Sequence, residues 1–184
     1  MIKVERWEDS LRRLCDGKGV RRVYDSYEAH INCHGKFLYC GTYPTEEEAR
    51  EAVIITKIKI LEASIIAHGD DPAKVVECVD EGYFASPRGN IYNRHGDLMI
   101  GCVDRCGYRH TILNRKQRNI HRVIAETFIP NPQNKPCVNH KDGNKLNNDV
   151  ANLEWCTHSE NTIHSFQTGL QTTNRWGKVN KYGY

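Results

Sequence analysis

The first third of the chain alternates apolar and polar residues in a pattern that predicts short strands followed by one long helix. The three strands are expected at residues 21–24, 29–32 and 36–42. The helix should begin after Thr45, because Thr45 and Glu48 have the spacing of a capping box. Gly69 is a suitable residue for the end of this helix. A three-stranded sheet packed on a helix is therefore expected here.

The second half of the chain predicts shorter elements separated by polar turns. Strands are expected at residues 97–100 and 108–113, followed by a helix over residues 120–128 that Pro130 ends. The pattern then becomes strand, polar loop, strand and helix, at residues 137–140, 142–152, 153–156 and 158–169. Thr157 and Glu160 form a second capping box at the start of the last helix.

These elements predict an α+β chain of two small domains. The expected divisions are an N-terminal domain at 1–69, an acidic linker at 70–82, a second domain at 83–170 and a polar, basic tail at 171–184. A length of 184 residues suits two domains that each have a limited core.

Composition excludes a membrane protein and a dedicated nucleic-acid coat. Hydrophobic residues make up 39% of the chain and charged residues 27%, which is ordinary for a soluble protein. No apolar run has the length of a membrane span and the first residues are charged, so an intracellular protein without a membrane partner is expected. The net charge of +3 is small, but basic residues concentrate at Arg105, Arg109, Arg115, Lys116, Arg118 and Arg122. This stretch is either a solvated face or, beside a phosphate-handling site, a nucleic-acid contact.

The eight cysteines do not predict a disulfide framework, because the chain shows no secretion signal. A zinc site is an alternative, and its four ligands would be Cys102, Cys106, Cys137 and Cys156. Since no CxxC pair occurs, the spacing of a zinc knuckle is missing and no structural zinc is expected.

The strand-loop-strand-helix segment can bring Asn139, His140 and Asn161 together. Hydrolysis of a phosphodiester needs a base for water, a cation on the phosphate and stabilisation of the leaving oxygen. Histidine suits the first task because it can be neutral near pH 7, and asparagine oxygens are acceptable ligands for Mg²⁺. The residues therefore predict a one-metal nuclease.

The same segment resembles the HNH, or ββα-metal, nuclease family, and most closely the HNH homing endonucleases of phages and group I introns. The matching pieces are residues 138–145, 147–148, 152–155 and 160–161. The resemblance implies that His140 is the general base, that Asn139 and Asn161 bind Mg²⁺ or Mn²⁺, and that Asn152 braces the loop. His164, one turn beyond Asn161, is a secondary candidate ligand. It further implies double-stranded DNA as the partner, strand nicking by a monomer or homodimer, and the cytoplasm of a bacterial or phage-infected host.

One residue departs from this family pattern. Many relatives have aspartate immediately before the base histidine, whereas this chain has Asn139. A neutral ligand should weaken metal binding, so a magnesium requirement on the order of millimolar is expected. Asp142 or Glu160 are alternative sources of the missing charge. Three other functions stay open: an HNH-fold DNA-binding protein with weak or lost catalysis, a zinc-stabilised nucleic-acid-binding module that uses the cysteines, and an RNA nuclease.

The N-terminal domain resembles an AP2-type DNA-binding domain over about residues 19–66. The matching pieces are residues 29–31, 35–36, 38–43 and 45–49. In that family the sheet lies in the major groove and the helix supports it from behind. The resemblance implies DNA contacts from Arg21, Arg22, Tyr24, His30, Asn32 and Lys36. Further contacts are expected from Arg115, Lys116, Arg118 and Arg122, and a protein-docking module is the alternative for the N-terminal domain.

Overall fold

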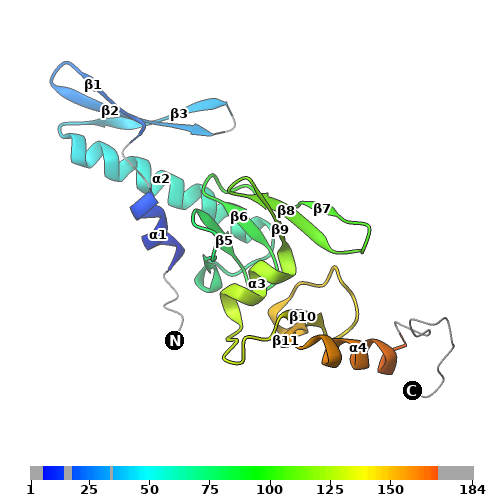
Figure 1. Ribbon diagram of the computed structural model, residues 1–184. Coiled ribbons are helices and arrows are strands. Elements are labelled where there is room, and N and C mark those ends of the chain that lie inside the picture. The colour runs from blue at the N-terminus through cyan, green and yellow to red at the C-terminus, as the bar shows by residue number, and fades with distance from the viewer. Residues whose placement is uncertain (1–5, 15–17, 34, 170–184) are drawn as a thin grey trace. The chain divides into compact units, whose positions relative to one another are not determined.

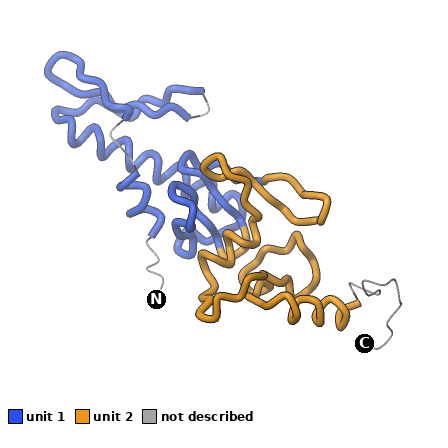
Figure 2. The backbone as a smooth tube through the Cα atoms, in the orientation of Figure 1, with its two compact units in different colours: residues 1–86, 90–100 blue, residues 87–89, 101–184 orange. Residues whose placement is uncertain are grey.

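The computed structural model describes residues 6–14, 18–33 and 35–169, so the predicted tail at 171–184 lies outside the described residues. The chain divides into two compact units (Figure 2). Unit 1 comprises Met1–Ser86 and Asn90–Ile100, and unit 2 comprises Pro87–Gly89 and Gly101–Tyr184. The predicted domain limits at residues 69, 82 and 170 stay predictions, and each unit is described by itself below.

The first part of unit 1 is a three-stranded antiparallel sheet packed on a long helix, as the sequence predicted (Figure 1). The strands are β1 (Val20–Val23), β2 (Ser26–Cys33) and β3 (Lys36–Tyr43), in the order β1-β2-β3. Helix α2 (Glu46–Ala67) starts at the predicted capping box, in which the Thr45 side chain accepts a hydrogen bond from the Glu48 amide. The AP2-like character of this layer stays a prediction.

One face of the sheet packs on α2 and the other faces away from it. Ala29 and Ile31 of β2 are buried with Ala49 and Val53 of the helix. Because successive side chains of a strand point to opposite faces, His30 and its neighbours on the alternate positions lie on the outward face. The apolar alternation of β2 thus determines which residues are available to a partner.

A second cluster of unit 1 forms around helix α1 (Trp7–Leu14), which the sequence analysis did not anticipate. Trp7 and Leu11 are buried against Leu61 and Ile65 of α2. The Trp7 indole N–H also donates to the backbone oxygen of Pro72 at 2.9 Å. The remaining elements of this unit are η1 (Pro72–Lys74), β4 (Val76–Glu77), β5 (Tyr83–Ala85) and β6 (Ile91–Asn93), with sheet order β4-β5-β6.

The strand predicted at residues 97–100 is wrong. The Asn93 side-chain oxygen accepts hydrogen bonds from the amides of His95, at 2.8 Å, and Asp97, at 3.0 Å, and so forms a turn. Strand pairing there is limited to one bridge between Tyr92 and Leu98, with backbone hydrogen bonds from the Met99 amide to the Ile91 oxygen at 2.7 Å and from the Asn93 amide to the Asp97 oxygen at 3.0 Å. The Asn93 turn takes up the start of the predicted strand, and the pairing that follows is too short to form one.

The described residues of unit 2 form two small antiparallel sheets, two α-helices and a short 3-10 helix, so the predicted α+β class is confirmed. Its first elements are β7 (Cys102–Val103), β8 (Arg109–Leu113), β9 (Lys116–Asn119) and α3 (Ile120–Phe128). The following elements are β10 (Cys137–His140), η2 (Val150–Asn152), β11 (Leu153–Cys156) and α4 (His158–Gln167). Helix α3 has the predicted bounds and buries Ile120, Val123 and Ile124.

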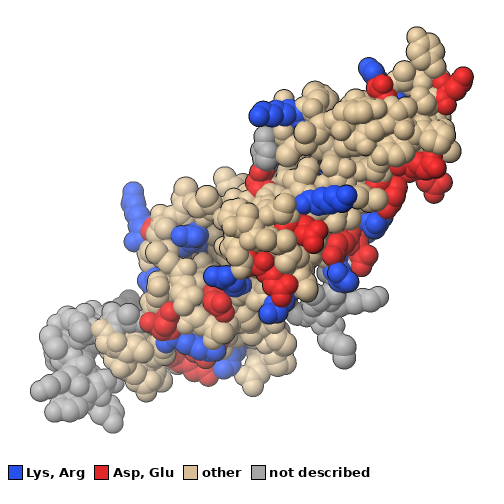
Figure 3. Space-filling model, turned by 180° about the vertical axis from the view of Figure 1, so that it is seen from behind, with Lys and Arg blue, Asp and Glu red and all other residues tan. Residues whose placement is uncertain are grey.

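The surface mixes both signs of charge. Figure 3 shows Lys and Arg side chains interspersed with Asp and Glu over one face of the molecule. Several of these side chains form exposed ion pairs, such as Arg12 with Glu51 at 2.7 Å and Arg13 with Glu77 at 2.7 Å. Within the described residues, no helix is long and apolar enough to cross a membrane.

Leu61→Ala tests the cluster around α1. Leu61 is fully buried, so we expect its truncation to lower the free energy of unfolding by roughly 2–5 kcal/mol through lost burial and a cavity. Urea denaturation of the full chain measures the change. Lys59→Ala, at an exposed position of the same helix, is the control and should change stability by less than about 0.5 kcal/mol. Equal effects of the two substitutions would contradict this assignment of the core.

Candidate active site

The site is assembled by the β10–β11 hairpin and helix α4. Asn139 pairs with Glu154 and His140 with Leu153 across the hairpin. Beside it lies a hollow of about 280 Å³. Its lining residues are Tyr108, Val138, Asn139, His140, Gly143, Lys145, Asn161, Thr162, His164 and Ser165. The structure therefore brings together the predicted base and all three predicted metal ligands.

The His140 side chain is buried and held in one orientation. It is 4% exposed, and its Nε2 lies 3.1 Å from the Oδ1 of Asn148, which is also buried. Because an amide oxygen only accepts hydrogen bonds, Nε2 carries the proton and Nδ1 keeps a free lone pair. Asn148 lies in the family-like segment, yet no role for it followed from the sequence, since only the fold shows that it reaches the ring.

Two further groups of unit 2 surround the imidazole of His140. The His121 ring lies 5.2 Å from it and the Tyr108 ring 6.0 Å from it, measured between centroids. Burial lowers the pKa of His140, an effect that the hydrogen bond to Asn148 partly opposes. Burial, followed by the nearby charge of His140, lowers the pKa of His121 to about 4. Both imidazoles are therefore neutral at pH 7.

The Asn139 side chain is oriented by a carboxylate that the sequence analysis overlooked. Its Nδ2 donates to the Oε1 of Glu154 at 2.8 Å. A carboxylate cannot donate, so the nitrogen of the amide has to face Glu154 and the oxygen is left for the hollow. Cross-strand pairing of Asn139 with Glu154 is the cause of this contact.

The two carboxylates that were alternatives for the missing charge are engaged elsewhere. The Asp142 side chain accepts from Asn147 at 2.7 Å and from Asn152 at 2.9 Å. Glu160 completes the capping box of α4 and accepts from Lys135 at 3.0 Å. Neither residue lines the hollow, so their contacts favour a role in bracing the fold.

Asn152 lies outside the hollow and ties the loop between the two strands. Its Oδ1 accepts from the Asp142 amide at 3.0 Å. Its Nδ2 donates to the Asp142 carboxylate and to the Asn147 backbone oxygen, both at 2.9 Å. These three bonds hold the two ends of the loop together.

Helix α4 contributes Asn161 and His164 to the hollow, one turn apart. His164 Nε2 donates to the backbone oxygen of Lys141 at 3.1 Å, which orients the ring and leaves Nδ1 as an acceptor. The capping box at Thr157 determines where the helix starts and thereby which side chains reach the hairpin.

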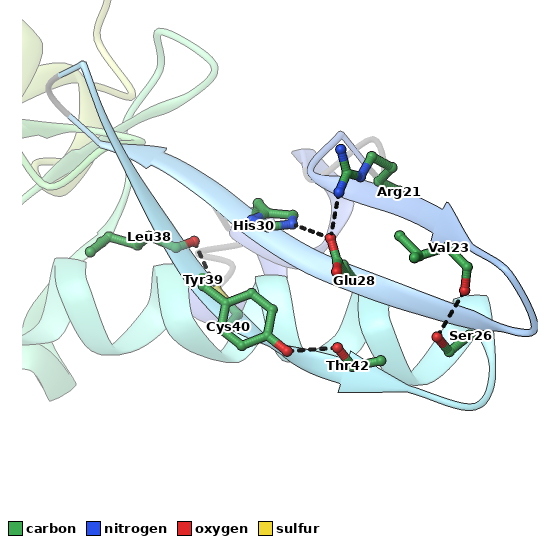
Figure 4. Close-up of polar contacts among 9 residues, drawn as sticks. All are labelled: Arg21, Val23, Ser26, Glu28, His30, Leu38, Tyr39, Cys40 and Thr42. Carbon is green, nitrogen blue, oxygen red and sulfur yellow. Dashed lines mark hydrogen bonds and ion pairs between the residues drawn. The ribbon is translucent and has the colours of Figure 1, made fainter.

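The predicted DNA contacts of unit 1 do not all lie on one face of the sheet. Figure 4 shows Arg21 and His30 on the outward face, each bound to Glu28, at 2.9 and 3.2 Å. Asn32 follows His30 by two residues in β2 and is exposed. Tyr24 is 92% exposed at the β1–β2 turn. The remaining two predicted contacts, Arg22 and Lys36, pair with Tyr27 and Cys33, whose side chains pack toward α2.

Sequence reasoning missed two aromatic side chains on the outward face of this sheet. Phe37 and Tyr39 of β3 are 77% and 62% exposed. They pair with Asn32 and His30, and the rings of Tyr39 and His30 are 5.5 Å apart. The alternation of residues 36–43 was a usable signal, because it places both aromatics opposite the helix-facing positions.

The four predicted DNA contacts of unit 2 fall into two groups. Arg118 and Arg122 both pair with Glu126, and Arg122 also donates to the Pro136 oxygen at 2.9 Å. Arg115 and Lys116 are exposed at the β8–β9 turn. Arg115 and Lys116 are thus better placed for a DNA contact than the pair held by Glu126.

The cysteines of the zinc alternative are not gathered at one point. Cys137 and Cys156 face each other across the β10–β11 hairpin, while Cys102 and Cys106 are exposed. Within the described ranges no three His, Cys, Asp or Glu side chains form a group able to hold a metal. The geometry does not favour a zinc-stabilised module.

Comparison with known proteins shows what part of the second unit is similar to. Residues 118–163 match the family model of the HNH endonucleases. The match includes the β10–β11 hairpin and the start of α4, with Asn139, His140, Asn152 and Asn161, and ends before His164. The predicted relation of this segment to the HNH endonucleases is confirmed.

Individual relatives agree with that class. A protein of Acanthamoeba polyphaga mimivirus named uncharacterized HNH endonuclease L245 is 38% identical over 57% of this chain and 33% of its own. The DNA endonuclease I-HmuI of Bacillus phage SP01 is 28% identical over 55% of this chain and 62% of its own. A solved structure of the HNH homing endonuclease I-HmuI aligns over 50% of this chain and 56% of its own, with 31% identity and a TM-score of 0.45. The chain thus spans less than two thirds of these relatives.

Lowering the pH should destabilise unit 2 through His121. The pKa of His121 is about 4 in the folded chain and near 6.5 in an unfolded one, so the unfolded chain takes up the proton first as the pH falls. Stability should therefore decrease between pH 6.5 and 4, by about 3 kcal/mol from this residue.

Urea denaturation as a function of pH measures this loss. His121→Phe keeps a planar ring without a titrating group, so its stability should depend less steeply on pH over the same range. A variant with the same pH dependence as the unchanged chain would show that His121 is not buried in neutral form.

Proposed function

We propose that this chain is a DNA endonuclease of the homing or phage type that hydrolyses phosphodiester bonds, with His140 as the general base and one divalent metal. The hollow supports the proposal, because Asn139, His140, Asn161 and His164 line it together. A base with a free lone pair beside a small set of oxygen and nitrogen donors is the arrangement that phosphodiester hydrolysis requires.

His140 would take the proton from the attacking water through Nδ1. The hydroxide formed attacks phosphorus, and the bond between phosphorus and the leaving sugar oxygen breaks. Asn148 holds the Nε2 hydrogen and stabilises the imidazolium that forms. The lowered pKa of His140 keeps the ring unprotonated before the reaction.

The side-chain oxygens of Asn139 and Asn161 would hold Mg²⁺ or Mn²⁺, with His164 as a secondary ligand. Amide oxygens are hard donors and fit such an ion, although both are neutral. When bound, the ion supplies positive charge for the scissile phosphate and the leaving oxygen. The Glu154 carboxylate accepts a hydrogen bond from the Asn139 amide and so fixes its orientation. A carboxylate therefore contacts Asn139, the proposed metal ligand.

Double-stranded DNA is the proposed substrate. The relatives named as a DNA endonuclease and an HNH homing endonuclease support this choice. Contacts would come from the outward face of the β1–β3 sheet and from Arg115 and Lys116, with the AP2-like role of the sheet as part of the proposal. One site per chain implies a nick by a monomer, or cleavage of both strands by a homodimer, inside a bacterial or phage-infected cell.

His140→Ala tests the enzyme and its base. Nicking of supercoiled plasmid in Mg²⁺ should fall by about 10²–10⁴-fold, the usual contribution of a general base. His68→Ala, at an exposed residue of unit 1, is the matched control and should nick as the unchanged chain does. DNA that contains the insertion locus of the gene serves as the second substrate.

The outcomes separate the alternatives. Equal nicking by His140→Ala and the unchanged chain would remove His140 as the base. Binding without cleavage on both substrates would favour an HNH-fold DNA-binding protein that has lost catalysis. Faster cleavage of RNA than of DNA under the same conditions would overturn the choice of substrate.

Asn139→Asp, alone and with Glu154→Gln, tests how the neutral ligand is tolerated. The single substitution puts two carboxylates at the present 2.8 Å contact, so it should lower stability without metal by roughly 1–3 kcal/mol. The double substitution keeps the net charge and restores a donor, because the amide introduced at position 154 can donate to the carboxylate introduced at position 139. It should recover stability and bind Mn²⁺ about tenfold more tightly, since charged ligands hold hard cations better.

Thermal denaturation without metal and calorimetric titration with Mn²⁺ measure the two effects. A stable single variant would contradict the importance of the Asn139–Glu154 contact. Unchanged Mn²⁺ affinity in the double variant would remove residue 139 from the proposed ligands.

A further inference from the structure

Unit 1 contains a second hollow, of about 330 Å³, whose charged lining is entirely basic. Lys18, Lys57 and Arg94 line it, together with His30 and His95. Among the described residues that line it there is no aspartate or glutamate, although the surface elsewhere mixes both signs of charge. Such a local excess of cations indicates an anionic ligand.

The cations come from elements that are fixed to one another within unit 1. Arg94 and His95 lie in the turn that the Asn93 side chain closes. The Ser64 hydroxyl of α2 donates to the Gly96 backbone oxygen at 2.5 Å, which attaches this turn to the helix that also bears Lys57. Gly96 suits this turn because its φ is +86°, a backbone conformation that residues with a side chain rarely adopt.

The hollow is continuous with the outward face of the β1–β3 sheet. His30, Asn32 and Phe37 belong to that face and also line the hollow. Its inner side is apolar, since Leu11 and Leu14 of α1 contribute to it. An apolar wall strengthens the attraction between the cations and an anion because it excludes water.

We propose that this Lys57–Arg94 hollow binds a backbone phosphate of double-stranded DNA next to the segment that contacts the sheet. The inference rests on the proposed function, in which the sheet faces DNA. A guanidinium can bind a phosphate through two parallel hydrogen bonds, and ammonium groups add charge. The exposed ring of Phe37 and the amide of Asn32 at the rim suit a sugar and its base better than a simple anion.

Lys57→Gln and Arg94→Gln test the proposal by the salt dependence of DNA binding. Fluorescence anisotropy of a labelled duplex is recorded between about 50 and 200 mM salt, with the full chain in EDTA so that no metal-dependent cleavage occurs. Each variant should bind more weakly at low salt, and the slope of log K against log salt should become shallower by about one. Lys59→Gln is the matched control, because it lies on the same helix, is exposed, and does not line the hollow.

Each outcome bears on the proposal separately from the nuclease activity. Unchanged slopes in Lys57→Gln and Arg94→Gln, with normal DNA binding by the unchanged chain, would overturn the phosphate site and leave the endonuclease intact. Reduced slopes in a chain that never cleaves DNA would support the phosphate site while the nuclease proposal fails. Tighter binding of polyglutamate than of duplex would overturn the site in favour of an acidic protein partner, and no binding of duplex at all would overturn both.

Discussion

The register of β10 against β11 is the constraint on which the candidate active site depends. It places Asn139 opposite Glu154, so that the amide of Asn139, a proposed metal ligand, has a fixed orientation, and it ends the strand at His140. A slip of one residue would turn each side chain to the other face of the hairpin. The loop that follows is held by Asn152, and the same loop supplies Asn148 to His140. The strand register, the contacts of the loop and the orientation of His140 therefore depend on one connected set of contacts.

Electrostatics explains how this set tolerates a neutral residue where many relatives have aspartate. Asn139 and Glu154 form a donor and acceptor pair, whereas two carboxylates at the same contact would repel each other. The hairpin thus contains a negative charge on Glu154 of β11. Glu154 pairs with Asn139 and does not line the hollow. Burial is the largest cause of the lowered pKa of His140, the hydrogen bond to Asn148 opposes it, and the nearby charges of Asp142 and Lys145 act in opposite directions. Burial therefore does more than any nearby charge to keep this imidazole neutral.

Most of the fold could be predicted from local signals, because they are properties of a few neighbouring residues. The capping boxes at Thr45 and Thr157 predict where α2 and α4 begin, and the apolar alternation predicts β2. Local signals failed where a side chain bonds to a nearby backbone group, as Asn93 does to the Asp97 amide at the start of the segment expected to be a strand. The roles of Asn148 and Glu154 could not be predicted, because each contact is made across the hairpin or its loop and depends on register. Helix α1 escaped notice because it has few apolar residues, and only packing against α2 shows their purpose.

Net charge is a weak test of the DNA binding proposed for this chain, for a structural reason. Many of its cations are matched by nearby carboxylates, as Arg21 is by Glu28 and as Arg118 and Arg122 are by Glu126. The total is therefore only +3, although basic side chains are numerous. Charge is nevertheless uneven locally: the described residues that line the Lys57–Arg94 hollow include Lys18, Lys57 and Arg94 and no aspartate or glutamate. Because interactions between exposed charges are screened beyond about 10 Å at moderate salt, a phosphate responds to such a local cluster and not to the sum. The proposed DNA contacts of this chain therefore require local clusters of cations and not a large net charge.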